Sequence, residues 1–570
     1  MWLGITMIKN YDRIVRSLSV PESFRRKSVF LKLSLGDDEG FFSGIPLMEA
    51  LRKTDSECYM IVSSEGSKVV RTLESAWKIL DGESDASKRF LSMVNEAFAK
   101  KGEKPFVKFI SKPDVVLQHR DGKFQGAGEK VDVRDADGWI EGVNKGGIEE
   151  ACRSMLEGGF NMRADEDFAQ LIPTPPIKPR LPKEDYLASY IEAAVLQNVA
   201  KSIGNEVTSV SLSFKPDQNL PTDSHCESLI VFWALEHEKK IEEPIFKAYS
   251  DLSAEMGLSE ICVPPRVCFG FIGEGYLGKD VFGDVVGYPT PNGKTRWQDG
   301  FKLIRKHDWY PQFEEDGREP LLRFAITETI PVETFSRTIN VDYGFMREKC
   351  AKIRDAVNGA EKVVVEGREV DGARTRMSVE VGNRRAKVDD GIVNMSSEAN
   401  FGNFPAGEVF ITPEAVQGVF VADEVIVIDK SYLLKSPLII ELKRNEYEVI
   451  DGPKEILDAI RREREKAWKR IEDWEAMGVP RDLVELNKKN FMNIGEFAVG
   501  LNPNARVSRY LIEAEKIDRT VHIALGSGYD PDRPTTYHWD SVAGWNQKLS
   551  VTAVKKGRGI PILKEGSWEI

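Results

Sequence analysis

The chain has 570 residues, which is more than one hydrophobic core usually serves, so two or three domains are expected. A hydrophobic fraction of 41% and a charged fraction of 30% are typical of a globular protein. The 91 acidic and 79 basic side chains give a formal net charge of −12, and no basic cluster interrupts this balance, which argues against a nucleic-acid partner.

Residues 1–175 are expected to form an α/β region whose role the sequence does not reveal. Strand-like apolar runs at residues 28–35 and 59–63 alternate with helical patterns at residues 68–80 and 88–100. Such an alternation of strands and helices is typical of an α/β fold.

A second α/β region is expected over residues 176–337. Five prolines in residues 172–183 remove backbone donors, which favours an extended linker at its start. The elements expected in this region are a helix at residues 183–203, a strand at 208–214, an apolar run at 229–235 and a helix at 244–256.

Residues 338–570 are expected to form a C-terminal α+β domain that is rich in β-strands. In residues 375–381, Thr, Met and Val at the odd positions alternate with Arg, Ser and Glu, which predicts a strand with one buried face. A highly charged stretch at residues 453–490 has helical spacing, so it is expected to be a helical excursion from the β-rich domain.

Two of the six histidines of the chain fall sixteen positions apart near its C-terminus. In residues 520–526 the two-residue period of a strand places His522 on the face opposite Val521, Ile523 and Leu525, away from the core unless the strand is buried on both faces. In residues 538–540 the same period projects His538 and Asp540 to one side, where both can meet one cation.

Three further acids complete a candidate ligand set. Glu408 and Glu496 each follow a glycine, which lets a backbone or a substrate approach closely, and Glu515 lies seven positions before His522. Four carboxylates and two imidazoles suit zinc, cobalt or manganese, and six ligands exceed the needs of one tetrahedral zinc. Two divalent cations that share a carboxylate are therefore expected.

Several motifs resemble those of the aminopeptidase T and AmpS-like family of dinuclear metallo-aminopeptidases. They are Asn-Phe-Pro-Ala-Gly-Glu-Val-Phe at residues 403–410, Asn-Ile-Gly-Glu at 493–496, Glu-Lys at 515–516, Thr-Val-His-Ile-Ala-Leu-Gly at 520–526 and His-Trp-Asp at 538–540. The resemblance extends from about Thr338 to the C-terminus and is weak before it.

The resemblance implies a β-rich metallopeptidase domain that removes N-terminal residues from peptides with a water molecule activated by two metals. Glu496 would also move a proton, and the Tyr529 phenol would donate a hydrogen bond to the oxyanion. A homodimer that encloses a large cavity is also implied. The metal ligands that the resemblance implies are Glu408, Glu496, Glu515, His522, His538 and Asp540.

Two alternatives remain open. The first is a catalytically inactive, metal-binding dimeric scaffold, because residues 1–337 match the family poorly. The second is an oxidoreductase that uses the glycine motif Gly273-Glu-Gly275-Tyr-Leu-Gly278, although no helical pattern follows this motif to hold a pyrophosphate. The six scattered cysteines, the lack of a secretion signal and the lack of a long apolar stretch favour a cytoplasmic protein without a membrane partner.

Overall fold

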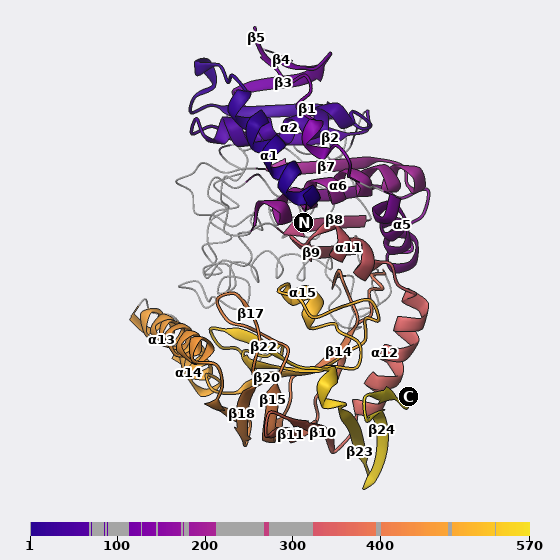
Figure 1. Ribbon diagram of the computed structural model, residues 1–570, viewed down its shortest axis with the longest axis vertical. Helices are drawn as coiled ribbons and strands as arrows, with labels where there is room; N and C mark the ends of the chain where they lie inside the picture. Colours follow the sequence, from indigo (N-terminus) through magenta and orange to yellow (C-terminus); the bar gives the residue numbers. More distant parts are fainter. Residues whose placement is uncertain are drawn as a thin grey trace. The chain divides into compact units, whose positions relative to one another are not determined.

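The computed structural model describes ten stretches of the chain and five single residues between them, and they fall into two compact units (Figure 1). The first unit comprises Met1–Tyr276, Asp299–Ser336 and Val393–Gly402, and the second comprises Leu277–Gln298, Arg337–Ile392 and Asn403–Ile570. The described residues are 2–65, 67, 70, 85, 88, 113–126, 128–143, 146–172, 175, 182–212, 267–272, 323–394, 401–476, 481–530 and 532–570.

Several expected elements fall on residues that are not described. Residues 229–235 and 244–256 and the glycine motif at residues 273–278 lie wholly outside the described part of the chain. The expected helices at residues 68–80 and 88–100 lie outside it apart from one residue each, and the proline-rich stretch is described only at its ends and at Pro175.

A ten-stranded sheet forms the centre of the first unit, in the order β13-β9-β8-β6-β7-β2-β1-β3-β4-β5. Nine of its strands come from the two α/β regions that the sequence predicts, and β13 comes from residues that were expected in the C-terminal domain. β1 is parallel to β2 and β3, and β6 is parallel to β7 and β8, while β2 and β7 join the two groups in antiparallel fashion. The strands are β1 (Ser28–Ser34), β2 (Glu57–Ser63), β3 (Val115–Arg120), β4 (Lys123–Gly126), β5 (Glu129–Asp132), β6 (Phe168–Ile172), β7 (Val207–Leu212), β8 (Val267–Ile272), β9 (Arg323–Glu328) and β13 (Phe401–Asn403).

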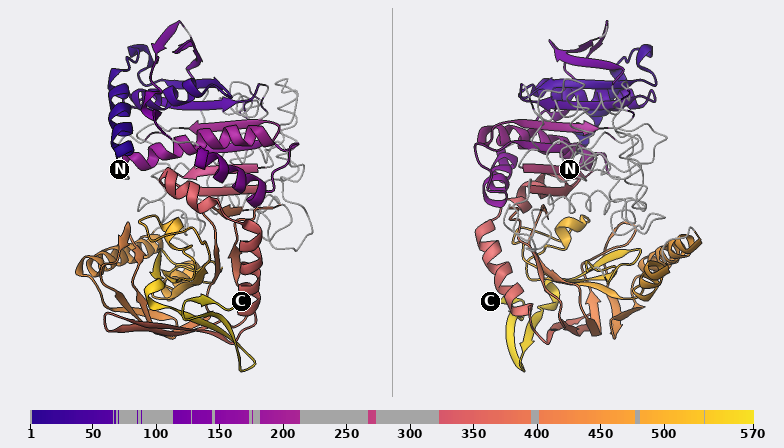
Figure 2. Two further views of the ribbon diagram at one scale, coloured as in Figure 1. Left: turned by 45° about the vertical axis from the view of Figure 1, so that its right-hand side comes forward. Right: turned by 180° about the vertical axis from the view of Figure 1, so that it is seen from behind.

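Helices accompany the parallel strands of this sheet. Helix α2 packs on β1 and β2, and α6 packs on β6 and β7 (Figure 2). Val29, Phe30 and Leu31 on β1 are all buried, as is usual for a parallel strand that is covered on both faces. The helices are α1 (Trp2–Ser17), α2 (Asp38–Arg52), α5 (Gly146–Ser154), α6 (Lys183–Ile203) and, at the end of the unit, α11 (Val332–Ile339).

The second unit is built on two antiparallel sheets. The eight-stranded sheet has the order β19-β18-β15-β11-β10-β23-β24-β25, and the seven-stranded sheet has the order β12-β14-β20-β21-β22-β16-β17. The strands are β10 (Lys362–Val370), β11 (Ala373–Glu380), β12 (Lys387–Asp389), β14 (Glu408–Ile411), β15 (Ala415–Ala422), β16 (Val425–Val427), β17 (Ser431–Leu433), β18 (Leu438–Lys443), β19 (Glu446–Asp451), β20 (Ile494–Gly500), β21 (Val521–Gly526), β22 (His538–Ala543), β23 (Ser550–Lys555), β24 (Arg558–Lys564) and β25 (Ser567–Trp568).

One hydrophobic core joins both sheets of the second unit to helices α12 (Tyr343–Val357) and α13 (Lys454–Ala476). On β11 the predicted alternation is confirmed, because Thr375, Met377 and Val379 are buried while Arg376 and Glu380 are exposed. The seven-stranded sheet contributes the side chains of Phe497 and Val499 from β20, Val521, Ile523 and Leu525 from β21, and Trp539 from β22 to this core. Its opposite face carries the residues between them.

The charged segment at residues 453–490 contains helices α13 and α14 (Arg481–Lys489). The buried side chains of Ile456, Ile460 and Ile471 attach α13 to the core, and most of its charged residues are exposed, whereas Glu463 is buried. Among the helices of the described residues, none has both the length and the apolar composition that crossing a bilayer requires. A short helix, α15 (Leu511–Ala514), precedes Glu515.

Candidate metal centre

Strand register brings the candidate ligands together on the face of the seven-stranded sheet that points away from the hydrophobic core. Glu496 on β20 and Asp540 on β22 are both paired with Ala524 on β21, which lies between them. His522 lies two residues before Ala524 and His538 two residues before Asp540, so all four side chains project from the same face. Neighbours on that face are small, since it also carries Ala498, Gly500 and Gly526.

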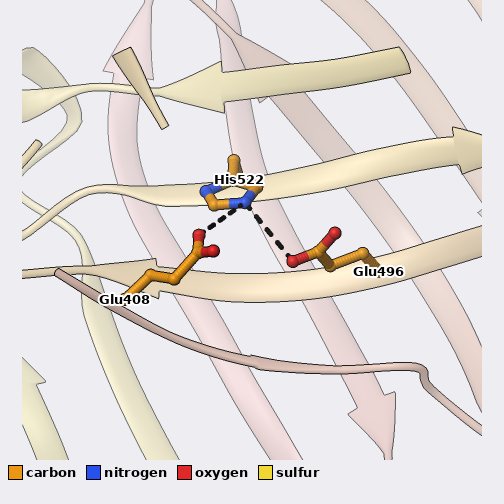
Figure 3. A group of neighbouring side chains, drawn as sticks. All are labelled: Glu408, Glu496 and His522. Atoms are coloured by element: carbon orange, nitrogen blue, oxygen red, sulfur yellow. Dashed lines mark ion pairs between the residues drawn. The ribbon is translucent and has the colours of Figure 1, made fainter. Parts of the chain in front are cut away.

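Glu408 joins this group from β14, the strand next to β20. It is paired with Gly500, and Figure 3 shows its carboxylate and that of Glu496 pointing toward the His522 imidazole. The distances from His522 Nε2 are 3.4 Å to Glu408 Oε2 and 3.7 Å to Glu496 Oε1. His538 Nε2 lies 3.3 Å from Glu496 Oε2 and 3.3 Å from Asp540 Oδ1.

The six residues form three overlapping triads, and within each triad the possible ligand atoms lie within 4.8 Å of one another. Glu496 belongs to two triads and presents a different oxygen to each histidine. The triads are Glu408 with Glu496 and His522, Glu496 with His538 and Asp540, and Glu515 with His522 and Asp540.

The two glycines that precede Glu408 and Glu496 both allow close approach of the backbone. A side chain at Gly495 would place its Cβ 1.9 Å from the carbonyl oxygen of Ser527, and one at Gly407 would lie 2.8 Å from the backbone nitrogen of Asn502. Gly407 also has a φ of +123°, a conformation that favours glycine. The sequence suggested that either a backbone segment or a substrate approaches these glycines, and in the structure it is a backbone segment at both.

The Ser527 carbonyl that approaches Gly495 also orients His538. Its oxygen lies 2.7 Å from His538 Nδ1, and because a carbonyl only accepts hydrogen bonds, Nδ1 carries the hydrogen. Nε2 is then the ring nitrogen that faces Glu496 and Asp540. A backbone carbonyl that fixes the imidazole in this way is a common partner of metal-binding histidines.

A buried lysine lies among the carboxylates. Lys516 is fully buried, and its Nζ lies 2.5 Å from Glu408 Oε1, 2.9 Å from Glu515 Oε1 and 3.2 Å from Asp389 Oδ2. The turn that carries it is fixed by Asn502, whose backbone N–H donates to the Lys516 carbonyl and whose side chain donates to the Ala406 carbonyl. Asn502 therefore connects the segments that carry Lys516 and Glu408.

Burial and the surrounding charges shift several pKa values in this cluster. Burial raises the pKa of Glu408 and of Glu515 to about 7 in spite of the Lys516 ammonium. Burial also acts to raise the pKa of Glu496, but the neighbouring imidazoles of His522 and His538 outweigh it and lower this pKa to about 2. Burial acts to lower the pKa of His522, and the carboxylates of Glu496 and Glu408 raise it to about 9.

The donor set fits a divalent metal centre. Glu408 Oε2 and Asp540 Oδ1 are buried and have no hydrogen-bond partner among the described residues, so protein donors do not satisfy these oxygens. Buried carboxylates are normally paired or coordinate a metal. Carboxylate oxygens together with imidazole nitrogens suit zinc, cobalt or manganese.

Tyr529 lies beside this cluster on the loop between β21 and β22. The centre of its ring is 5.5 Å from that of His538 with an edge-on geometry, and the residue is 55% exposed. Its backbone N–H donates to Thr412 Oγ1 over 3.0 Å. This arrangement leaves the Tyr529 side chain at the edge of the site.

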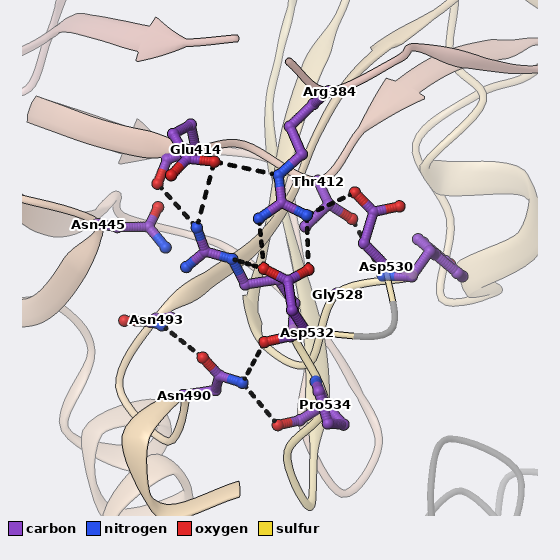
Figure 4. Close-up of polar contacts among 12 residues, drawn as sticks. Arg384, Thr412, Glu414, Asn445, Asn490, Asn493, Gly528, Asp530, Asp532 and Pro534 are labelled. Atoms are coloured by element: carbon purple, nitrogen blue, oxygen red, sulfur yellow. Dashed lines mark hydrogen bonds and ion pairs between the residues drawn. The ribbon is translucent and has the colours of Figure 1, made fainter. Parts of the chain in front are cut away.

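Ion pairs anchor the same loop to neighbouring segments (Figure 4). The Arg384 guanidinium donates to both carboxylate oxygens of Asp532, over 2.6 and 2.7 Å, and to Asp530 over 2.9 Å. It also reaches Glu414 over 3.2 Å, while the Asn490 side chain donates to the carbonyls of Asp532 and Pro534. The loop that carries Tyr529 is thus held at several points.

The structure brings all six predicted ligands to one place, with Tyr529 beside them, whereas their metal binding and catalytic roles stay predictions. Sequence reasoning missed Lys516 and Asp389. The signal for Lys516 was its position directly after Glu515, between Ala514 and Ile517, where a charge needs a partner. Of the four other histidines, His119 is the one within the described residues, and its Nδ1 lies 2.9 Å from Asp37, as expected of a structural role.

Comparison with known proteins gives a weak likeness. No protein-family model matches the chain, and no curated protein matches it. Among solved structures, wild-type AmpT from Thermus thermophilus is similar with a TM-score of 0.42 and 13% sequence identity, over 74% of this chain and 99% of that chain. A likeness at this level does not establish a family, so the function is inferred from the site itself.

Proposed function

We propose that the chain is a metal-dependent aminopeptidase. The observation that carries the proposal is the convergence of four carboxylates and two imidazoles on one buried sheet face, with oxygens that have no hydrogen-bond donor among the described residues. The motifs around these residues resemble those of dinuclear metallo-aminopeptidases, which supports a peptide as the substrate.

Two divalent cations are proposed because Glu496 belongs to two different triads and presents a separate oxygen to the histidine of each. Glu408, Glu496 and His522 would hold one cation, while His538 and Asp540 would hold the other together with the second oxygen of Glu496. Glu515 is also a proposed ligand, because it forms a triad with His522 of the first group and Asp540 of the second. When bound, the cations would polarise the scissile carbonyl and lower the pKa of a water molecule so that hydroxide is available near neutral pH.

Glu496 was predicted both to bind metal and to move a proton. Its two oxygens face different histidines, at 3.7 and 3.3 Å, and the residue is 2% exposed. These contacts favour the role of a shared ligand. The proton that the attacking water loses must also reach the leaving amine, and Glu496 remains the proposed carrier because it lies between both halves of the site.

Tyr529 is proposed to assist at the scissile carbonyl. Its ring edge lies against His538 and its side chain is exposed, so the phenol can reach a substrate that approaches the ligands. A hydrogen bond from the phenol to the developing oxyanion would stabilise the transition state.

The homodimer remains a prediction. Its enclosed cavity would admit peptides to the site and exclude folded proteins.

The test uses the full-length protein, stripped of metal and reloaded with cobalt, manganese or zinc. Peptides with a free N-terminus are compared with the same peptides acetylated at the N-terminus, and released amino acids are measured. We expect release from the free peptides only, since an aminopeptidase requires the amine. Release should be lost in Glu496→Gln and kept in Glu448→Gln, a matched change at an exposed position.

Two results would contradict the proposal. Cleavage of acetylated and free peptides at equal rates would indicate a different hydrolase. Stoichiometric metal binding without release from any peptide would favour the inactive metal-binding scaffold.

A further inference from the structure

Lys516 differs from the six proposed ligands because it is a fully buried ammonium, which cannot itself bind a cation. A buried ammonium is costly unless several acceptors replace water. Here three carboxylates surround it, those of Glu408, Glu515 and Asp389. The first two are proposed metal ligands, whereas Asp389 belongs to none of the possible metal triads among the described residues.

The contacts of Lys516 distinguish the two oxygens of Glu408. Oε1 accepts a hydrogen bond from Lys516 Nζ over 2.5 Å, while Oε2 lies 3.4 Å from His522 Nε2 and has no hydrogen-bond partner among the described residues. Glu515 likewise has one oxygen, Oε1, against the ammonium at 2.9 Å. An oxygen that accepts a hydrogen bond from an ammonium at this distance binds a second cation less readily, because the two positive charges repel each other.

We infer that Lys516 is a positioning residue that makes Glu408 and Glu515 one-oxygen ligands of the metal centre. The inference rests on the proposed metal centre and deepens it. The ammonium occupies Oε1 of each carboxylate and turns the remaining oxygen toward the metals. Asp389, which is not a proposed ligand, is the third carboxylate in contact with the ammonium, at 3.2 Å.

The charges of the site agree with this role. Five carboxylates meet here, those of the four acidic ligands and of Asp389, and one ammonium with two divalent cations balances them. Removing Lys516 together with Asp389 keeps this balance, so a double variant is still expected to load metal. Removing both members of a buried pair is also tolerated better than removing one.

The experiment compares three full-length proteins loaded with cobalt, namely the wild type, Asp389→Asn and the double variant Lys516→Met/Asp389→Asn. Visible absorption of Co²⁺ reports coordination number, since d–d bands weaken and shift to shorter wavelength as ligand atoms are added. Bound cobalt is counted in each sample, and near-ultraviolet circular dichroism checks that each variant is folded.

We expect the wild type and Asp389→Asn to share one spectrum, because both keep the ammonium. The double variant should show weaker bands at shorter wavelength, because the freed Oε1 atoms join the coordination shell. An unchanged spectrum in the double variant, or an equal change in both variants, would overturn the role of Lys516 while leaving the proposed function intact. If the wild type takes up no cobalt, the proposed metal centre itself fails.

Discussion

Gly495 offers a direct way to perturb the proposed metal centre from its surroundings, without altering a proposed ligand. In Gly495→Ala the new Cβ would lie 1.9 Å from the Ser527 carbonyl oxygen, whereas real Cβ atoms essentially never come closer than 3.0 Å to such an atom. The carbonyl must therefore move by about 1 Å, the difference between these two distances. This carbonyl accepts the His538 Nδ1 hydrogen at 2.7 Å, so the imidazole loses its orienting partner.

The cost follows from these two effects. Overpacking of a well-packed interior costs about 1–3 kcal/mol, and loss of one hydrogen bond adds about 1 kcal/mol. The free energy of unfolding should thus fall by roughly 2–4 kcal/mol, which lowers the melting temperature by about 5–15 °C for a unit of this size. Loss of an orienting partner typically weakens metal binding by about 10- to 100-fold.

Both effects can be measured on the same samples. Calorimetry gives the melting temperature without metal, and a competition titration with a chelator gives the zinc affinity. The matched control is Gly147→Ala, because a Cβ at this exposed helical position has no neighbour within 4 Å, and it should change neither quantity adversely. If Gly495→Ala retains the wild-type melting temperature and zinc affinity, the close contact with Ser527 does not orient His538.

Three further predictions concern the surroundings and the charge of the site. Arg384→Met should lower the free energy of unfolding, measured by urea titration, by about 1 kcal/mol at low salt. The loss should be smaller in 1 M salt, because the salt already screens the ion pairs of Arg384 with Asp530 and Asp532 in the wild type. An equal loss at both salt concentrations would refute this reasoning. Burial and then Asp423 raise the pKa of Glu424 to about 7, so the folded state loses stability as pH rises from the ordinary pKa of 4.5 through 7. Glu424→Gln should therefore raise the melting temperature at pH 8 and change it little at pH 4. A larger gain at pH 4 than at pH 8 would contradict this prediction. Cobalt affinity should rise from pH 6 to pH 8, because His522, with a pKa of about 9, must lose its proton to become a ligand. A titration series in which the affinity falls over this range would exclude His522 as a ligand.

The sequence was most informative where periodicity decides the direction of a side chain. Alternation in residues 520–526 separated His522 from Val521 and Ile523, and the structure places the latter two in the core and His522 on the opposite face. His522 is nevertheless buried, because β21 is covered on both faces. The sequence allowed this exception but offered no local signal for it.

The positions of Lys516 and Asp389 depend on contacts between distant segments. Lys516 meets Glu408 across 108 positions of sequence, and this contact requires the pairing of β14 with β20 and the turn held by Asn502. Local propensity does not encode such a contact, since strand pairing over long separations is fixed by tertiary packing. The family motif at residues 515–516 includes this lysine, but its contacts with Glu408 and Asp389 are visible in the structure alone.

The ten-stranded sheet shows the same limit on a larger scale. Strands β1 and β2 were expected near their observed positions, as was helix α6, because apolar runs and helical spacing are local signals. The antiparallel pairing of β2 with β7 joins segments about 150 positions apart, and neither segment carries a feature that identifies its partner. The order of the strands was therefore not predictable from the residues.

The central claim is that acidic and imidazole side chains of the second unit bind two divalent cations. The most direct measurement is the number of zinc or cobalt ions per chain, determined by mass spectrometry after saturation and removal of free metal. We expect about two ions per chain in the wild type and fewer in His538→Ala, which removes a proposed ligand. A wild-type chain without bound metal, or the same count in both proteins, would contradict the account.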